Sequence, residues 1–243
     1  MYRRHFILIL LALSSLAAGQ ALYQNPLYRL YYESVSVPQE LINGKEYLPY
    51  YFHSKSKTTP LLFSGEVFNA TLKIKGRVYR NTGLQYDTYL DELIYIDTSR
   101  IIDNMYPRIA LNKDIVDGFS FVFKGDSMKF RYLKFPNKEF TDGFYEIAYD
   151  GGTRFMIRHR STQYNFDAID EYKYLPERYI MAVGKYYEIR NNGSFLKIFG
   201  EQSDKMKEYL RKSRIKIRQA DKNDIVRVLT YFDSLNKRET VVN

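Results

Sequence analysis

The chain has 243 residues, a formal net charge of +9 at pH 7 and no cysteine. The absence of thiols excludes disulfides, cysteine nucleophiles and a cysteine-linked lipid anchor. Its 24 tyrosines and 16 phenylalanines favour β-structure, because aromatic rings fit a pleated, half-buried surface.

Residues 1–19 have the three-part pattern of a secretory signal peptide. Arg3 and Arg4 give the charged start, Phe6–Leu13 form an unbroken apolar run, and Ala17–Gly19 supply the small residues before cleavage. The apolar run is shorter than the ~20 residues that span a bilayer as a helix. We therefore expect export, and a mature chain of about 224 residues.

Residues 20–60 are rich in tyrosine but poorly periodic, and they contain Pro26, Pro38 and Pro49. We interpret them as an N-terminal arm with one strand near Tyr47–Phe52. His53, at the exit of that strand, is predicted to face solvent.

Residues 61–200 alternate apolar and polar side chains, the period-two pattern of half-buried strands. Lys124–Ser127 is predicted to be a turn between two of them. The strands are expected in the segments Ala70–Tyr79, Leu84–Asp97 (as two short strands), Gly118–Phe123 and Met128–Phe135.

The segment Tyr145–Arg158 contains Asp150-Gly151-Gly152 between two alternating runs, which predicts a hairpin turn. A phosphate-binding loop would instead lead into a helix. Beyond the turn, Arg154, Arg158 and Arg160 share one face by parity and are interpreted as a solvated strand face. His159 falls on the other face, in a structural role.

A second hairpin is predicted at Asn191–Ser194, between strands at Tyr179–Arg190 and Phe195–Phe199. Repeated adjacent strands indicate a mainly β (α+β) fold. Its core is expected to be an antiparallel meander, as a curved sheet or partial barrel.

Residues 201–243 change to helical spacing, which predicts two C-terminal amphipathic helices packed on or beside the sheet. The first is expected from Ser203 to Lys212, and the second from a cap at Asn223 to about Leu235. Between them, Arg214–Arg218 alternates and is compatible with an extended segment. Seven cations mark this region as a candidate binding patch, with a solvated helix face as the alternative: Lys205, Lys207, Arg211, Lys212, Arg214, Lys216 and Arg218.

The sequence contains none of the catalytic or metal-binding motifs considered below. His53 and His159 are the only histidines after the predicted signal peptide, and no metal-binding or serine-hydrolase motif occurs. The acidic run Asp87, Asp91, Glu92 and Asp97 is interpreted as turn and edge residues. Near Asp221, helix capping is favoured over calcium binding. We therefore predict no catalytic, cofactor-binding or metal-binding residue, and a protein that is not an enzyme.

Nucleic acid is also excluded as a partner, because the tyrosines are spread over every predicted strand without a stacking motif. No stretch after the signal is long and apolar enough for an integral helical membrane protein.

Three sequence phrases carry a family resemblance: GLQYDTYLDELIYI at Gly83–Ile96, GFYEIAYDGG at Gly143–Gly152 and GKYYEIRNNGSFLKIF at Gly184–Phe199. With the two basic helices behind them, the chain resembles uncharacterised exported β-rich proteins of Bacteroidota. The resemblance covers most of the mature chain and implies no assigned activity. It favours a periplasmic location, with an outer-membrane-associated or extracellular one as the alternatives.

The leading hypothesis is an exported, non-catalytic protein that binds an envelope protein, an anionic lipid or a polysaccharide. A lipid or apolar small-molecule carrier with a half-barrel cavity is the second hypothesis. An outer-membrane-associated β protein is the third.

Overall fold

The computed structural model describes residues 37–50, 58–99, 101–102, 104–136, 140–166 and 169–241. The predicted signal peptide and His53 lie outside the described residues. The chain divides into two compact units, residues 1–42 and 43–243. The first contributes the short helix α3 (Gln39–Ile42).

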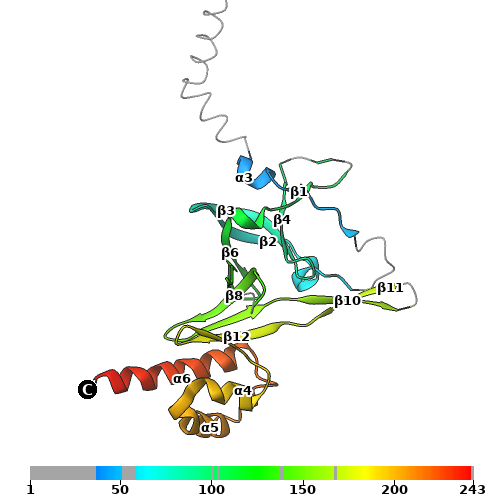
Figure 1. The fold of residues 1–243 in the computed structure, drawn as a ribbon. Helices are drawn as coiled ribbons and strands as arrows, with labels where there is room; N and C mark the ends of the chain where they lie inside the picture. Colours follow the sequence, from blue (N-terminus) through cyan, green and yellow to red (C-terminus); the bar gives the residue numbers. More distant parts are fainter. Residues whose placement is uncertain are drawn as a thin grey trace, which may run out of the picture. The chain divides into compact units, whose positions relative to one another are not determined.

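The second unit is built on an antiparallel sheet of eleven strands (Figure 1). Their order is β1-β5-β4-β3-β2-β6-β7-β8-β9-β12-β13, so the curved sheet has two edges and is not closed. A separate hairpin pairs β10 with β11. The mainly β fold predicted from the sequence, with a curved antiparallel sheet and a C-terminal helical region, is confirmed. The strands are β1 (Lys45–Glu46), β2 (Phe68–Ile74), β3 (Arg77–Asp87), β4 (Glu92–Ile96), β5 (Arg108–Ala110), β6 (Val116–Phe123), β7 (Asp126–Leu133), β8 (Gly143–Asp150), β9 (Arg154–Arg158), β10 (Ser161–Phe166), β11 (Ile169–Tyr174), β12 (Glu177–Ala182) and β13 (Lys185–Glu188).

Three hairpin turns consist of a residue followed by glycine, both at positive φ: Lys75–Gly76, Lys124–Gly125 and Val183–Gly184. Positive φ at both central residues is the geometry of the type I′ turn. The first and third turns divide Ala70–Tyr79 and Tyr179–Arg190, each of which was predicted as one strand. Those predictions were wrong because lysine and valine are unusual at the first position of this turn.

The turn between β8 and β9 confirms the hairpin predicted at Asp150-Gly151-Gly152. Neither glycine has a positive φ. The structure instead needs space at Gly151, where an added Cβ would lie 2.4 Å from the Tyr149 hydroxyl oxygen and 2.5 Å from Asp233 Oδ2. Glycine is required here so that a carboxylate from the C-terminal helix can approach the turn.

The second predicted hairpin is wrong. Asn191 does not begin a turn but caps the helix α4 (Asn192–Leu196), which runs into η4 (Lys197–Gln202). Its side-chain oxygen accepts the backbone N–H of Ser194 at 3.0 Å, and the Ser194 hydroxyl accepts the backbone N–H of Asn191 at 3.2 Å. This reciprocal pair is a capping box, and it competes with the hairpin for the same asparagine.

The two predicted C-terminal helices are present as α5 (Ser203–Lys212) and α6 (Lys222–Val241). The caps predicted at Ser203 and Asn223 are wrong, whereas the helix capping favoured near Asp221 is confirmed. No side chain caps α5, because η4 runs directly into it. At the start of α6 the acceptor is Asp221, whose Oδ1 accepts the backbone N–H of Asp224 at 2.7 Å, rather than Asn223.

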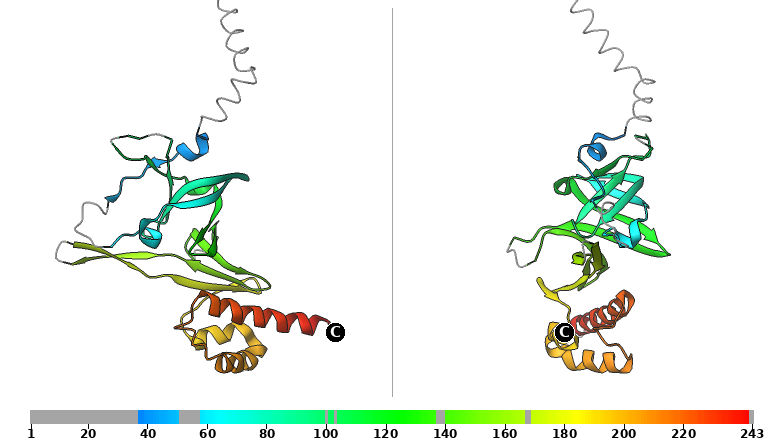
Figure 2. Two further views of the ribbon diagram at one scale, coloured as in Figure 1. Left: turned by 180° about the vertical axis from the view of Figure 1, so that it is seen from behind. Right: turned by 90° about the vertical axis from the view of Figure 1, so that its right-hand side faces the viewer.

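The helices α4, α5 and α6 lie together beside β12 in both views of Figure 2. They form one apolar cluster with β9 and β12, in which Phe155 and Ile180 of the sheet and Val228 of α6 are fully buried. Two side-chain contacts fix this packing. Arg178 donates to the backbone oxygen of Ala220 at 2.9 Å, and Asp233 accepts the Tyr149 hydroxyl at 2.8 Å.

Aromatic rings fill one face of the central strands. Phe119 stacks on Phe130 with 4.4 Å between ring centroids, and Phe68 stacks on Phe121 at 4.0 Å. Tyr86 is fully buried among them. These contacts favour a packed interior over the cavity that an apolar-ligand carrier would need. Among the described helices, none has the length and apolar character needed to cross a bilayer.

Candidate functional sites

A connected set of polar side chains joins three strands or strand ends to the first residue of α6. Glu146 on β8 is 2% exposed, and His159, directly after β9, is 5% exposed. His159 Nε2 lies 2.8 Å from Glu146 Oε2, and His159 Nδ1 lies 2.6 Å from the Tyr174 hydroxyl on β11. Lys222 Nζ donates to Glu146 Oε1 at 3.1 Å. Both ring nitrogens of His159 therefore have protein partners, which suits the structural role expected for it.

The protonation states in this network do not resemble those of an activated nucleophile. Burial alone would raise the pKa of Glu146, but the hydrogen bonds and charges of His159 and Lys222 lower it below its ordinary value. The pKa of Tyr174 is raised, first by burial and then by the charge of Glu146. A nucleophilic tyrosine needs the opposite shift. The network is suited to holding β8, β11 and α6 together.

The arginines near this network correct one prediction. Arg158 is 8% exposed rather than solvated, and its Nη1 lies 3.7 Å from Glu177 Oε2. Arg160 is exposed and reaches the other oxygen of Glu177 at 3.2 Å. Parity could not show that Glu177 of β12 lies opposite Arg158 and also reaches Arg160. Arg154 pairs instead with Asp150, at 2.6 Å.

The acidic run at β3 and β4 was predicted correctly only in part, because Asp91 lies in the β3–β4 turn as expected while two other carboxylates are buried. Asp87 and Asp97 are 0% and 1% exposed, so they are not solvent-facing edge residues. Asp87 Oδ2 accepts the hydroxyls of Tyr47 at 2.7 Å and Tyr50 at 2.9 Å, and Oδ1 accepts the backbone N–H groups of residues 89 and 90. Four donors replace water around this carboxylate, so it ties the segment before residue 51 to the β3–β4 turn.

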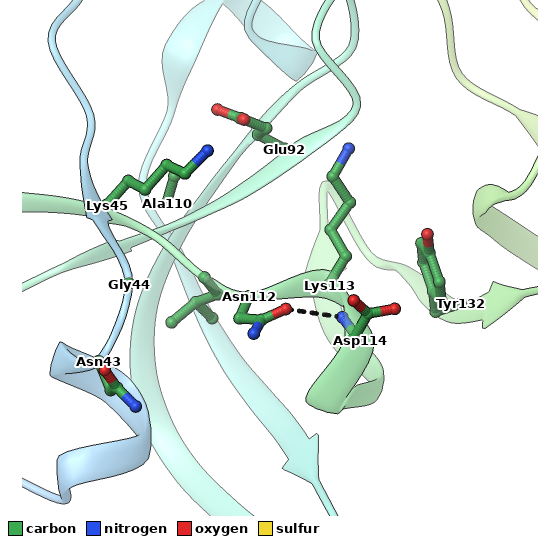
Figure 3. A pocket seen from close by; sticks show the side chains of 10 residues that line it. Asn43, Gly44, Lys45, Glu92, Ala110, Asn112, Lys113, Asp114 and Tyr132 are labelled. Atoms are coloured by element: carbon green, nitrogen blue, oxygen red, sulfur yellow. Dashed lines mark hydrogen bonds between the residues drawn. The ribbon is translucent and has the colours of Figure 1, made fainter.

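A polar groove of about 410 Å³ opens where β1, the start of β4 and the end of β5 meet η3 (Lys113–Ile115) (Figure 3). Gly44 shapes it, because a Cβ there would lie 2.3 Å from the Ala110 carbonyl oxygen and would force the two backbones apart. The polar side chains of this groove are Asn43, Lys45, Glu92, Asn112, Lys113, Asp114 and Tyr132.

The charges of the polar groove are arranged around Glu92. Figure 3 shows Lys45 and Lys113 on opposite sides of it. Burial raises the pKa of Glu92, the charges of Lys113 and Lys45 lower it, and the charges of Asp87 and Asp91 raise it further. Asp114 is engaged elsewhere, because its Oδ1 accepts from Lys134 Nζ at 2.8 Å. Sequence reasoning missed this site. It forms because β1 pairs with β5, which brings residues 45 and 110 together, and no local sequence motif predicts that pairing.

The seven cations predicted as a binding patch lie on α5 and the segment that follows it, and all of them are exposed. We call these residues the basic patch. Helix α5 buries Met206 and Leu210, which turns its charged side outward. After α5, Ile215 and Ile217 are buried while Arg214, Lys216 and Arg218 are exposed, so the predicted alternation is present outside any strand.

Within the basic patch, Lys212 pairs with Glu208 at 2.8 Å. Elsewhere among the described residues, no group of three or more histidine or acidic side chains is arranged to hold a metal ion. Comparison of the chain with protein-family models, with curated proteins and with solved structures gives no match.

Proposed function

We propose that this is an exported, non-catalytic protein that binds an anionic polymer of the cell envelope through the basic patch. The observation that carries the proposal is the exposure of all seven cationic side chains within residues 205–218. The N-terminal sequence pattern supports export, and the polymer is the partner class that a basic surface in that compartment would meet.

The basic patch is suited to a polymer rather than to a small ligand. Its cations are spread along a helix and an adjoining loop. Lysine and arginine on such a surface attract a chain of negative charges at many points, with little demand on exact geometry. Binding of this kind weakens as salt rises, because exposed charges are screened beyond ~8 Å at physiological ionic strength.

The test is binding of the purified protein to polygalacturonate, with neutral dextran as the comparison polymer. A variant carries four substitutions in the basic patch: Lys207→Gln, Arg211→Gln, Arg214→Gln and Lys216→Gln. We expect at least about 10-fold weaker binding at about 50 mM salt, because each cation at an anionic surface contributes roughly 1 kcal/mol before screening.

A matched control removes the same number of charges elsewhere. Lys73, Lys129, Lys173 and Lys185 are exposed on β2, β7, β11 and β13 and serve for this purpose as Gln substitutions. Equal loss of binding in both variants would show that binding depends on the net charge of the protein rather than on the basic patch, and would contradict the proposal. Absence of binding at low salt by the unaltered protein would do the same.

A further inference from the structure

We propose that a surface depression within the basic patch takes a phosphate monoester group carried by a sugar unit of the anionic polymer. The depression has a volume of about 480 Å³ and lies between the start of α4 and the segment that joins α5 to α6. The inference rests on the proposed function, because the two cations of the lining belong to the basic patch. It adds which chemical group of the polymer the protein recognises. The lining residues are Asn191, Asn192, Gly193, Lys216, Arg218 and Gln219.

The charges around the depression favour an anion. Lys216 and Arg218 are the charged members of the lining, and no acidic residue is among the six. In the part of the chain that the structure describes, neither cation forms an ion pair. The acidic residues nearest along the chain have other partners: Glu188 pairs with Arg190 at 2.6 Å, and Asp221 caps α6. An anion in the depression therefore meets two cations without a competing carboxylate in the lining.

The fold holds both cations in place. Ile217 lies between them in the chain and is fully buried, so Lys216 and Arg218 project outward on either side of it. The Ile217 backbone is fixed from two directions: its N–H donates to Asn192 Oδ1 at 3.0 Å, and its carbonyl oxygen accepts from Arg178 Nη2 at 3.2 Å. Because this segment is already ordered, binding costs little conformational freedom.

Charge and geometry together select phosphate. A phosphate monoester carries about −1.5 to −2 charges at pH 7, which balances both cations, whereas a carboxylate or a sulfate ester leaves one of them unneutralised. The Arg218 guanidinium can bind two phosphate oxygens at once, and the Lys216 ammonium can act as a point charge on the third. Asn192 uses Oδ1 for the Ile217 N–H, so its N–H₂ group can donate to a sugar hydroxyl. The volume lies within the ~300–1,000 Å³ of small-molecule sites.

The experiment is a titration of the purified protein with galactose 6-phosphate, galactose 6-sulfate, galactose and inorganic phosphate. It is carried out at about pH 7.5, above the second phosphate pKa of ~6. Binding is followed by shifts of the backbone amide signals of residues 216–219 in NMR spectra. We expect saturable shifts with galactose 6-phosphate, about 5-fold weaker binding of the sulfate because one negative charge is lost, and at least about 10-fold weaker binding of uncharged galactose.

Two variants locate the effect. Arg218→Gln should weaken galactose 6-phosphate binding by about 10-fold, because a charge-assisted contact is lost. Arg211→Gln is the matched control: it removes the same charge from the basic patch, but from α5 and outside the depression, and it should stay within about 2-fold of the unaltered protein. Each variant removes one patch cation, so the two should bind polygalacturonate alike.

The two proposals can fail separately. Equal binding of galactose 6-phosphate by the Arg218→Gln and Arg211→Gln variants would refute the phosphate site, while a loss of polymer binding confined to the four-Gln variant would still support the proposed function. Conversely, a protein that binds galactose 6-phosphate through Arg218 but no polymer would contradict the proposed function alone.

Three further results would overturn the inference. The first is an absence of saturable shifts with galactose 6-phosphate. The second is binding of galactose or galactose 6-sulfate as tight as that of the phosphate, which would contradict the charge argument. The third is inorganic phosphate binding more tightly than galactose 6-phosphate, which would assign the depression to a free phosphate ion rather than to a sugar unit.

Discussion

Glu146 offers the sharpest test of how the sheet holds its C-terminal helices. Its carboxylate is 2% exposed and accepts from His159 at 2.8 Å and from Lys222 at 3.1 Å. Glu146→Gln keeps the volume but removes the charge. The amide oxygen can accept from one of the two donors, and the amide N–H₂ then faces the other.

The expected loss at pH 7 is about 2–4 kcal/mol in the free energy of unfolding. A hydrogen bond to a charged group contributes ~1.5–3 kcal/mol, and removing one member of a buried ion pair costs ~3–5 kcal/mol. The Lys222 side chain is 25% exposed and can recover part of its hydration, which places the value below the upper limit. For a chain of this size the melting temperature should fall by about 4–16 °C.

The pH dependence gives an independent check. Because the pKa of Glu146 is lowered in the folded protein, its charge stabilises the fold above the unfolded-state pKa of ~4.3. That contribution is lost as pH falls through the folded-state pKa. The difference in stability between the unaltered protein and Glu146→Gln should therefore be full at pH 7 and shrink below about pH 4.

The assay is urea unfolding followed by far-UV circular dichroism over this pH range, with the exposed Glu171→Gln on β11 as the control. The control should change stability by less than about 0.5 kcal/mol. The reasoning is refuted if Glu146→Gln is as stable as the control at pH 7, or if its deficit grows in acid.

Substitutions at four further positions test other parts of the fold. Val183 has φ 49° and is 97% exposed, so Val183→Asn should relieve strain and raise stability by about 1 kcal/mol in the same unfolding assay; an unchanged midpoint would argue against strain. Asp233→Ala removes the acceptor of the Thr153 backbone N–H at 3.1 Å and should cost about 2–4 kcal/mol. Gly151→Ala should lower the free energy of unfolding less in the Asp233→Ala variant than in the unaltered protein. A double-mutant cycle that shows no coupling would contradict the close contact between Gly151 and Asp233. Asp87→Ala should lower the free energy of unfolding by about 2–4 kcal/mol, and Asp87→Asn should lower it less, because the amide keeps one acceptor oxygen. Equal shifts of the urea midpoint in the two variants would show that the hydrogen-bond acceptor does not stabilise the fold.

The central strands β3, β4, β6, β7, β8 and β9 were largely predictable, because an alternating strand needs only its own residues. The turns were harder, and Asn191 shows why. Asparagine serves equally well in a type I′ turn and as a helix cap. What decides between them lies downstream, where Phe195, Ile198 and Phe199 recur at helical spacing and are buried against the sheet. The helical period was present in the sequence, but the asparagine-glycine signal was given more weight.

Buried polar networks were beyond prediction for a different reason. Glu146 and Lys222 are 76 residues apart in the chain, and Asp233 and Thr153 are 80 apart. Neither pair has a local signal, because each depends on which strand lies next to which helix. The same limit hid the polar groove. A single charged residue in the sequence looks solvated until its partner is placed beside it, as Arg158 shows.

The basic patch was predictable because exposure requires no partner, and this bears on how the proposals can be tested. The C-terminal helices dock through Lys222, Asp233 and the Arg178 contact with Ala220, none of which belongs to the basic patch. Substituting patch cations should therefore leave the docking intact. If the four-Gln variant keeps its stability and loses polymer binding, the loss belongs to the exposed charges. If it unfolds, the assumption that docking and binding use separate residues is wrong.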